Sequence, residues 1–453
     1  MIDAQRSVER AGDLGELSIH QARLDNGLRV VIGRQPRLHG VAITLFVRVG
    51  SRHEDDANNG LSHFLEHMLY RGTVKHPSAH AQNHAFERLG GTLYAATATD
   101  HTTLSITVPP SSVGPTMALL GELLRGPRLG EIEIEKRIVR EEILEDLDER
   151  GRQIEPDNVS RAVMFAGSAL GYPITGPIDA LDRFDEPSMR AHLKRFYVAG
   201  NAALSVAGAC DVDEVMALAR QHLGDLPHGE EIAITPFVGS QRGFRRKHVP
   251  SPGSQTDLRI SFLTPGERHA MAPAIDLLLR VIDDGMSTRL YHRLCDAGGM
   301  VYDCSASWEP FEETGAIDLA AEVQHARLAQ VVSECLDLCE ELAREGPTDD
   351  EIDKARDRHK WAIEAALDDP GEIAAVLGGA VLFDRPKTLR ATQERLDRVR
   401  AEDVRDAAKA VFRRDGLTLV TVGSLDAQTR SAIRARLAKF GRGARRSGIA
   451  RAS

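Results

Sequence analysis

Apolar and polar positions follow two different periods along this chain. Alternating apolar runs at 92–97 and 102–108 predict strands, and Asp25-Asn26-Gly27 between two apolar runs predicts the turn of a hairpin. Apolar residues spaced three and four apart predict helices at 60–71, 111–125, 131–150 and 187–197. Strands mixed with helices in this way predict an α+β fold, in which a mostly antiparallel sheet packs against helices.

The pattern repeats at a constant offset in residue number, which predicts two homologous domains. Gly208 and Asp211 align with Gly423 and Asp426, and each copy reads as strand, glycine turn, aspartate cap and helix. The polar, Pro- and Gly-containing stretch 225–243 is the expected linker. The expected boundaries are an N-terminal domain at 1–224, a C-terminal domain at 244–440, and a basic tail at 441–453 that we expect to be disordered.

Composition narrows the classes of function. The chain has 453 residues, is 42% hydrophobic and carries a formal net charge of −10, so it lacks the basic surface that nucleic acid binding needs. Five scattered cysteines without a CxxC pair indicate neither a disulfide framework nor a cysteine zinc site. The first residues lack the apolar core of a signal peptide and no apolar stretch is long enough to span a membrane, so a cytoplasmic location is expected.

The segment His63-Phe64-Leu65-Glu66-His67 carries the candidate chemistry. In a helix, positions i, i+3 and i+4 share a face, so His63, Glu66 and His67 can point into one cleft. Two imidazoles one turn apart supply half of a tetrahedral zinc shell, and the neighbouring carboxylate can accept a proton from a water molecule. This order of residues is the reverse of HExxH and is the pattern of inverted zincins.

A third ligand should come from an acidic residue of the helix predicted at 131–150. If Ile132, Val139 and Ile143 face the core, Glu141 points to solvent and Glu142 lies on the flank. Glu142 is therefore the expected ligand, and Glu135, seven residues earlier on the same side, is a plausible partner that orients a ligand.

Simpler interpretations stand beside this one. On the pentapeptide alone, a polar helix surface explains the two histidines as well as a zinc site does. His80 and His84 have the same spacing but no acid between them, so they are expected to be solvated. Cys335 and Cys339 are expected to pack inside a helix. The acidic runs HEDDANN and EEILEDLDER could steer basic peptides, although such runs are usually solvated.

Six motifs together resemble the pitrilysin family of metallopeptidases. They are GLSHFLEHMLYRGT (60–73), LGGTLYAATATDHTTL (89–104), EKRIVREE (135–142), YPITGPIDAL (172–181) and GMSTRL with GGMVY (285–302). The resemblance covers nearly the whole chain and implies zinc ligands His63, His67 and Glu142, with Glu66 as general base. The family's spacing between the second histidine and the two acids is also matched, since 142 − 67 = 75 and 142 − 135 = 7.

The resemblance also implies how substrate and partner are bound. Peptides would add as a strand around 92–97, where Tyr94, Ala95 and Thr97 stand and where the family usually has Asn in place of Tyr94. The family's chamber has four such domains, so this chain would supply half of a clamshell. Tyr302 matches a substrate-binding tyrosine, but Cys295 stands where the family has Arg. A heterodimer with a zinc-free homologous subunit is therefore favoured over a homodimer.

The function expected from these features is that of a zinc-dependent endopeptidase. It would hydrolyse peptides or unfolded segments inside an enclosed dimeric chamber. Two alternatives remain open: a noncatalytic scaffold subunit of a larger complex, and a maturation protease dedicated to one peptide.

Overall fold

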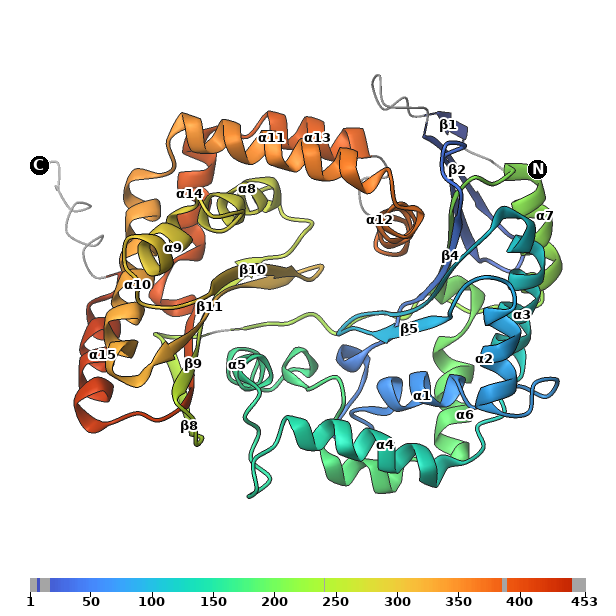
Figure 1. The fold of residues 1–453 in the computed structure, drawn as a ribbon, viewed down its shortest axis with the longest axis horizontal. Helices are drawn as coiled ribbons and strands as arrows, with labels where there is room; N and C mark the ends of the chain where they lie inside the picture. The colour runs from blue at the N-terminus through green and yellow to red at the C-terminus, as the bar shows by residue number, and fades with distance from the viewer. Residues whose placement is uncertain (1–5, 9–16, 240, 385–388, 442–453) are drawn as a thin grey trace, which may run out of the picture. The chain divides into compact units, whose positions relative to one another are not determined.

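The computed structural model describes residues 6–8, 17–239, 241–384 and 389–441, and these residues form two compact units (Figure 1). The first unit combines described residues from 1–145, 172–235 and 360–393. The second unit combines those from 146–171, 236–359 and 394–453. Apart from Gly441, the basic tail expected at 441–453 lies outside the described residues.

The first unit contains a seven-stranded sheet in the order β1-β2-β3-β7-β4-β6-β5. All neighbouring strands are antiparallel except β3 and β7. The predicted hairpin is confirmed, since β2 and β3 pair on either side of Asn26 and Gly27, and Gly27 has a φ of +96° that favours glycine. The strands are β1 (Arg6–Val8), β2 (Ser18–Arg23), β3 (Arg29–Arg34), β4 (Val41–Val47), β5 (Tyr94–Thr97), β6 (Thr102–Val108) and β7 (Ala202–Gly208).

The second unit contains a five-stranded sheet in the order β10-β11-β9-β12-β8. Its single parallel pair, β8 with β12, corresponds to β3 with β7, so the order β8-β12-β9-β11-β10 repeats β3-β7-β4-β6-β5. The predicted fold class, two homologous α+β domains with mostly antiparallel sheets, is confirmed. The strands are β8 (Arg245–Pro250), β9 (Gln255–Pro265), β10 (Cys304–Pro310), β11 (Thr314–Gln324) and β12 (Leu417–Gly423).

Helices pack against both sheets. Those of the first unit are α1 (Leu61–Leu69), α2 (Ala79–Glu87), α3 (Val113–Arg125), α4 (Ile132–Glu145), α6 (Glu186–Phe196), α7 (Val212–Leu223) and α12 (Pro370–Leu382). Those of the second are α5 (Pro156–Met164), α8 (Ala272–Ile282), α9 (Arg289–Tyr291), α10 (Leu328–Glu345), α14 (Ala401–Val411) and α15 (Ala427–Lys439). Helices α11 (Asp349–Ala366) and α13 (Leu389–Asp397) cross from one unit to the other. Within the described ranges, no helix is both long and apolar enough to cross a bilayer.

The helix predicted at 131–150 ends earlier, at Glu145. Beyond it, the Asp148 carboxylate accepts hydrogen bonds from the backbone N–H groups of Arg150 and Arg152, and Leu147 pairs with Gln153 in an isolated bridge. These local bonds replace the helical ones, which an acidic, weakly apolar stretch does not favour.

Helix α12 covers one face of the first sheet, although it follows most of the second unit in sequence. Ile373, Ala374 and Leu377 share a buried cluster with Val31 and Ala207. Full burial of the larger members, Ile373, Leu377 and Val31, contributes about 1.5–3 kcal/mol each. Because residues 360–393 belong to the first unit, the two compact units cannot be separated at one position in the sequence. The boundaries 1–224 and 244–440 describe the two copies of the sequence repeat, and they stay a prediction.

Candidate metal centre

Helix α1 presents three polar side chains on one face because its apolar residues face the core. Phe64, Leu65 and Met68 are fully buried, and His63, Glu66 and His67 project from the remaining face. His63 and Glu66 are themselves almost fully enclosed, being 8% and 7% exposed. The three residues therefore lie on one face of α1, as their spacing in the sequence predicts.

The start of α1 is held by Glu54, which sequence analysis did not single out. Its carboxylate accepts hydrogen bonds from the backbone N–H of Ser62 at 2.7 Å and of Gly60 at 2.8 Å, and from the Asn59 side chain at 3.0 Å. Burial raises the pKa of Glu54 above its ordinary value. The interpretation of HEDDANN as a solvated run is wrong at this position, because Glu54 is a buried cap of the helix that carries His63 and His67.

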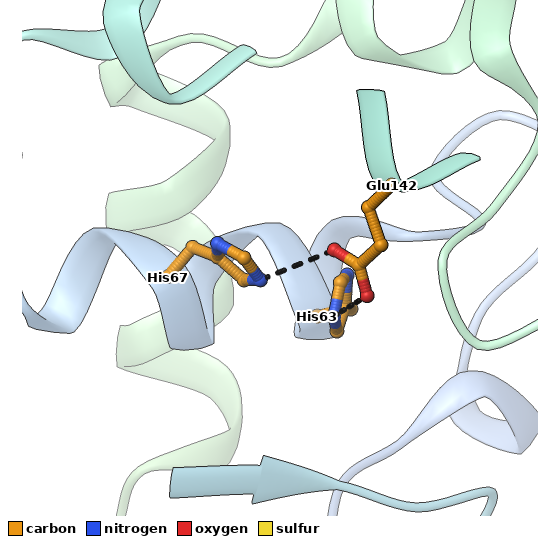
Figure 2. A group of neighbouring side chains, drawn as sticks. All are labelled: His63, His67 and Glu142. Carbon is orange, nitrogen blue, oxygen red and sulfur yellow. Dashed lines mark ion pairs between the residues drawn. The ribbon is translucent and has the colours of Figure 1, made fainter. Parts of the chain in front are cut away.

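Helix α4 brings Glu142 against the two histidines (Figure 2). Glu142 Oε1 lies 3.4 Å from His63 Nε2, and Glu142 Oε2 lies 3.5 Å from His67 Nε2. One ligand atom from each residue lies within 4.8 Å of the others. The neighbouring Glu141 is exposed, as the phase of the helix predicts.

The three residues are ion-paired in the structure, and their distances are also compatible with a shared metal ion. Bonds of about 2.0–2.2 Å from a tetrahedral zinc ion put neighbouring donor atoms roughly 3.3–3.6 Å apart. Each histidine nitrogen lies at such a distance from one of the two Glu142 oxygens. Two imidazole nitrogens and one carboxylate oxygen are also a common donor set of catalytic zinc sites, in which the fourth position is left for water. His63, His67 and Glu142 therefore fit zinc in both donor type and spacing.

The charges of the group favour a cation. Contacts with His63 and His67 hold the pKa of Glu142 far below its ordinary value, so its carboxylate is ionised at neutral pH. Burial alone would lower the pKa of His67, but hydrogen bonds with Glu135 and Glu142 outweigh it and raise that pKa to about 9. The carboxylates of Glu135 and Glu142 therefore favour a positive charge beside them, and a divalent ion would supply that charge.

Glu135 and Arg71 orient His67 from behind. Glu135 Oε1 lies 2.9 Å from His67 Nδ1, which leaves Nε2 directed at Glu142. Arg71 pairs with the other oxygen of Glu135, which is only 4% exposed. Such partners fix the ring orientation and tautomer of a ligating histidine. Arg71 was not predicted, although its position four residues after His67, just past the end of α1, could have suggested it.

Glu66 faces the edge strand β5. Its Oε2 accepts a hydrogen bond from Thr97 Oγ1 at 2.8 Å. Ala95 and Thr97 alternate with Tyr94, whose side chain is 66% exposed on the opposite face of the strand. On that face Tyr94 lines a cavity of about 550 Å³ together with Phe46 and His101. Tyr94 thus does not face Glu66, whereas Thr97 contacts it.

The remaining candidates belong to other segments. Tyr302 is part of the second unit and is 96% exposed. His80 and His84 are exposed on α2, and Cys335 and Cys339 are buried in the core of the second unit, as expected. In the sequence repeat, buried Leu278, Val281 and Ile282 of α8 replace His63, Glu66 and His67. The second unit therefore lacks this donor set at the equivalent positions.

Comparisons with known proteins identify the family and the fold. A model described as insulinase, peptidase family M16, matches residues 29–178, and one described as the peptidase M16 inactive domain matches residues 183–358. An uncharacterized zinc protease of Mycobacterium bovis is 26% identical over 404 residues, covering 88% of this chain and 92% of the relative. Another, from Bacillus subtilis, is 26% identical over 86% of this chain and 95% of its own length. A crystal structure of a Helicobacter pylori protease has the same fold, with a TM-score of 0.82, 20% identity, and coverage of 90% of this chain and all of that one.

Proposed function

This chain belongs to the pitrilysin family of peptidases, family M16, and on that premise we propose that it is a zinc-dependent endopeptidase acting on peptides or unfolded segments. The observation that carries the proposal is the spacing of the His63, His67 and Glu142 donors beside Glu66. Two further points support it. All four residues lie inside the match at 29–178, outside the match to the inactive domain, and the relatives are called zinc proteases.

The chemistry follows from the roles that these side chains can take. His63, His67 and Glu142 would hold the zinc ion, which when bound lowers the pKa of a water molecule and polarises a carbonyl. Glu66 would accept a proton from the attacking water and donate it to the leaving amine. Thr97 would keep the Glu66 carboxylate turned toward the edge of β5, where the scissile peptide would lie.

Removal of the metal tests this proposal. We expect about one zinc ion per purified chain, loss of peptide hydrolysis after dialysis against a chelator, and recovery of hydrolysis when zinc is returned. Atomic absorption and hydrolysis of a fluorescent peptide measure the two quantities. A chain that purifies without zinc and stays inactive when zinc is added would contradict the proposal and favour the scaffold role.

We also propose that the chain supplies half of a closed chamber and pairs with a homologous subunit that lacks zinc. Cys295 stands seven residues before Tyr302, so this chain does not offer an arginine at that spacing. A partner with an arginine there would complete the substrate site. We expect the chain alone to elute as a monomer on size-exclusion chromatography, and to hydrolyse peptides measurably but more slowly than the complex with its partner. A homodimer with high peptidase activity would contradict this pairing. The cytoplasmic location stays a prediction, and a maturation protease dedicated to one peptide stays an alternative.

A further inference from the structure

Strand β5 leaves one side of its backbone unpaired by the sheet, because it is the outer strand beside β6. The Ala98 N–H donates to His101 O at 2.8 Å where the two strands meet. Hydrogen-bonded and non-hydrogen-bonded pairs alternate from that point along an antiparallel ladder. Ala95 and Thr97 therefore direct their N–H and C=O groups away from β6, toward the edge where a peptide could pair.

One end of this edge is already occupied by the side chain of Tyr70, the C-cap residue of α1. The Tyr70 hydroxyl accepts a hydrogen bond from the Ala95 N–H at 2.5 Å and donates one to Leu93 O at 3.3 Å. Burial raises the pKa of Tyr70 to about 12, so the hydroxyl keeps the proton that it donates. This hydroxyl occupies the place that the main chain of an added strand would take at Leu93 and Ala95.

The other end of the edge lies beside Glu66. Tyr70, the C-cap of α1, follows Glu66 by four residues, a rise of about 6 Å in helical geometry. Two residues of β5 separate Thr97 from Ala95, a rise of about 6.6 Å in a strand. The two rises match, so the helix contacts β5 both through Glu66 at Thr97 and through Tyr70 at Ala95.

We propose that the Tyr70 hydroxyl closes this end of β5 and so selects the register in which an extended peptide pairs with the strand. The inference rests on the proposed function. The groups left for the peptide are the Ala95 C=O and the Thr97 backbone, next to Glu66. A peptide can shift along a strand only in steps of two residues if its side chains are to keep their faces. A peptide in the neighbouring register would have to bond to the Leu93 C=O and the Ala95 N–H, which the Tyr70 hydroxyl already occupies. Tyr70 therefore excludes that register and acts as a positioning residue.

The Tyr70→Phe variant tests the proposal because it keeps the ring and removes the hydroxyl. The full-length, zinc-loaded protein is incubated with an unstructured peptide long enough to offer several cleavage sites, and the products are identified by mass spectrometry. In the variant, we expect the ratio of the principal product to the product cut two residues away to fall by roughly 2- to 12-fold, the factor that one net hydrogen bond corresponds to. The KM should not rise, since the variant frees pairing groups on the strand.

Tyr172→Phe is the matched control. Its hydroxyl donates to the Asp56 carboxylate at 2.5 Å, on a different segment from β5. The product ratio of this control should equal that of the wild type. An unchanged ratio in Tyr70→Phe, or the same change in both variants, would overturn the role of Tyr70. Wild-type protein that holds zinc but cleaves no peptide would instead overturn the proposed function, so the two failures are distinct.

Discussion

Replacement of Glu66 by glutamine is expected to lower the kcat for peptide hydrolysis by roughly 10²- to 10⁴-fold, the usual contribution of general acid–base catalysis. Glutamine has almost the same shape, and its carbonyl oxygen can still accept the hydrogen bond from Thr97. It cannot take a proton from water at neutral pH. Since Glu66 is not one of the three proposed ligands, the zinc content should stay near one ion per chain.

The measurement compares initial rates with metal content in the same preparation. Glu87→Gln is a suitable control, because Glu87 is an exposed residue at the end of α2. Its rate should equal that of the wild type. A Glu66→Gln protein that cleaved peptides at the native rate would show that this carboxylate is not the base.

Replacement of Glu142 by glutamine is expected to weaken zinc binding by more than about 100-fold, because even changes behind a ligand typically cost 10- to 100-fold in affinity. The substitution removes the negative charge nearest to both Nε2 atoms. Peptidase activity should be lost together with the metal. Zinc content after dialysis against a chelator of known affinity measures the effect, and circular dichroism shows whether the fold is kept.

Glu141→Gln is the matched control for this experiment. It makes the same chemical change one residue away on α4, but its side chain is exposed. Zinc content and activity should both stay at the wild-type level. Equal loss of zinc in the two variants would mean that general charge, and not ligation by Glu142, holds the metal.

Periodicity was enough to predict the parts of the centre that lie on regular helices. The i, i+3, i+4 spacing places His63, Glu66 and His67 on one face of α1, and the phase of α4 separates Glu142 from Glu141. Both predictions depend only on the geometry of one helix and on which of its faces is apolar. The repeat offset likewise predicted the correspondence between β7 and β12.

Residues that act through tertiary contacts were missed for a common reason. Glu54 caps α1 from a loop, Arg71 holds a carboxylate of α4, and Tyr70 reaches the backbone of β5. Each role depends on how two separate segments approach, and periodicity within one segment carries no information about the other. A buried carboxylate such as Glu54 is also indistinguishable in sequence from the exposed acids beside it.

Helix α12 shows the same limitation at a larger scale. No helix was predicted at this segment from the sequence, and periodicity within it cannot tell which sheet such a helix covers. In the structure Gly378 lies so close to Phe46 of β4 that an added Cβ would clash with the ring. The helix therefore packs tightly on the first sheet, and the first unit is complete only with residues from near the end of the chain.

This late contribution affects how the protein emerges from the ribosome. The last strand of the first sheet ends at Gly208, whereas α12 ends at Leu382. At about 5–20 residues per second, translation of the roughly 170 residues between these two points takes roughly 10 to 35 seconds. A first sheet that formed during that time would expose the apolar face of Val31, Ala42 and Ala207, which α12 covers in the folded protein, and chaperones could bind there.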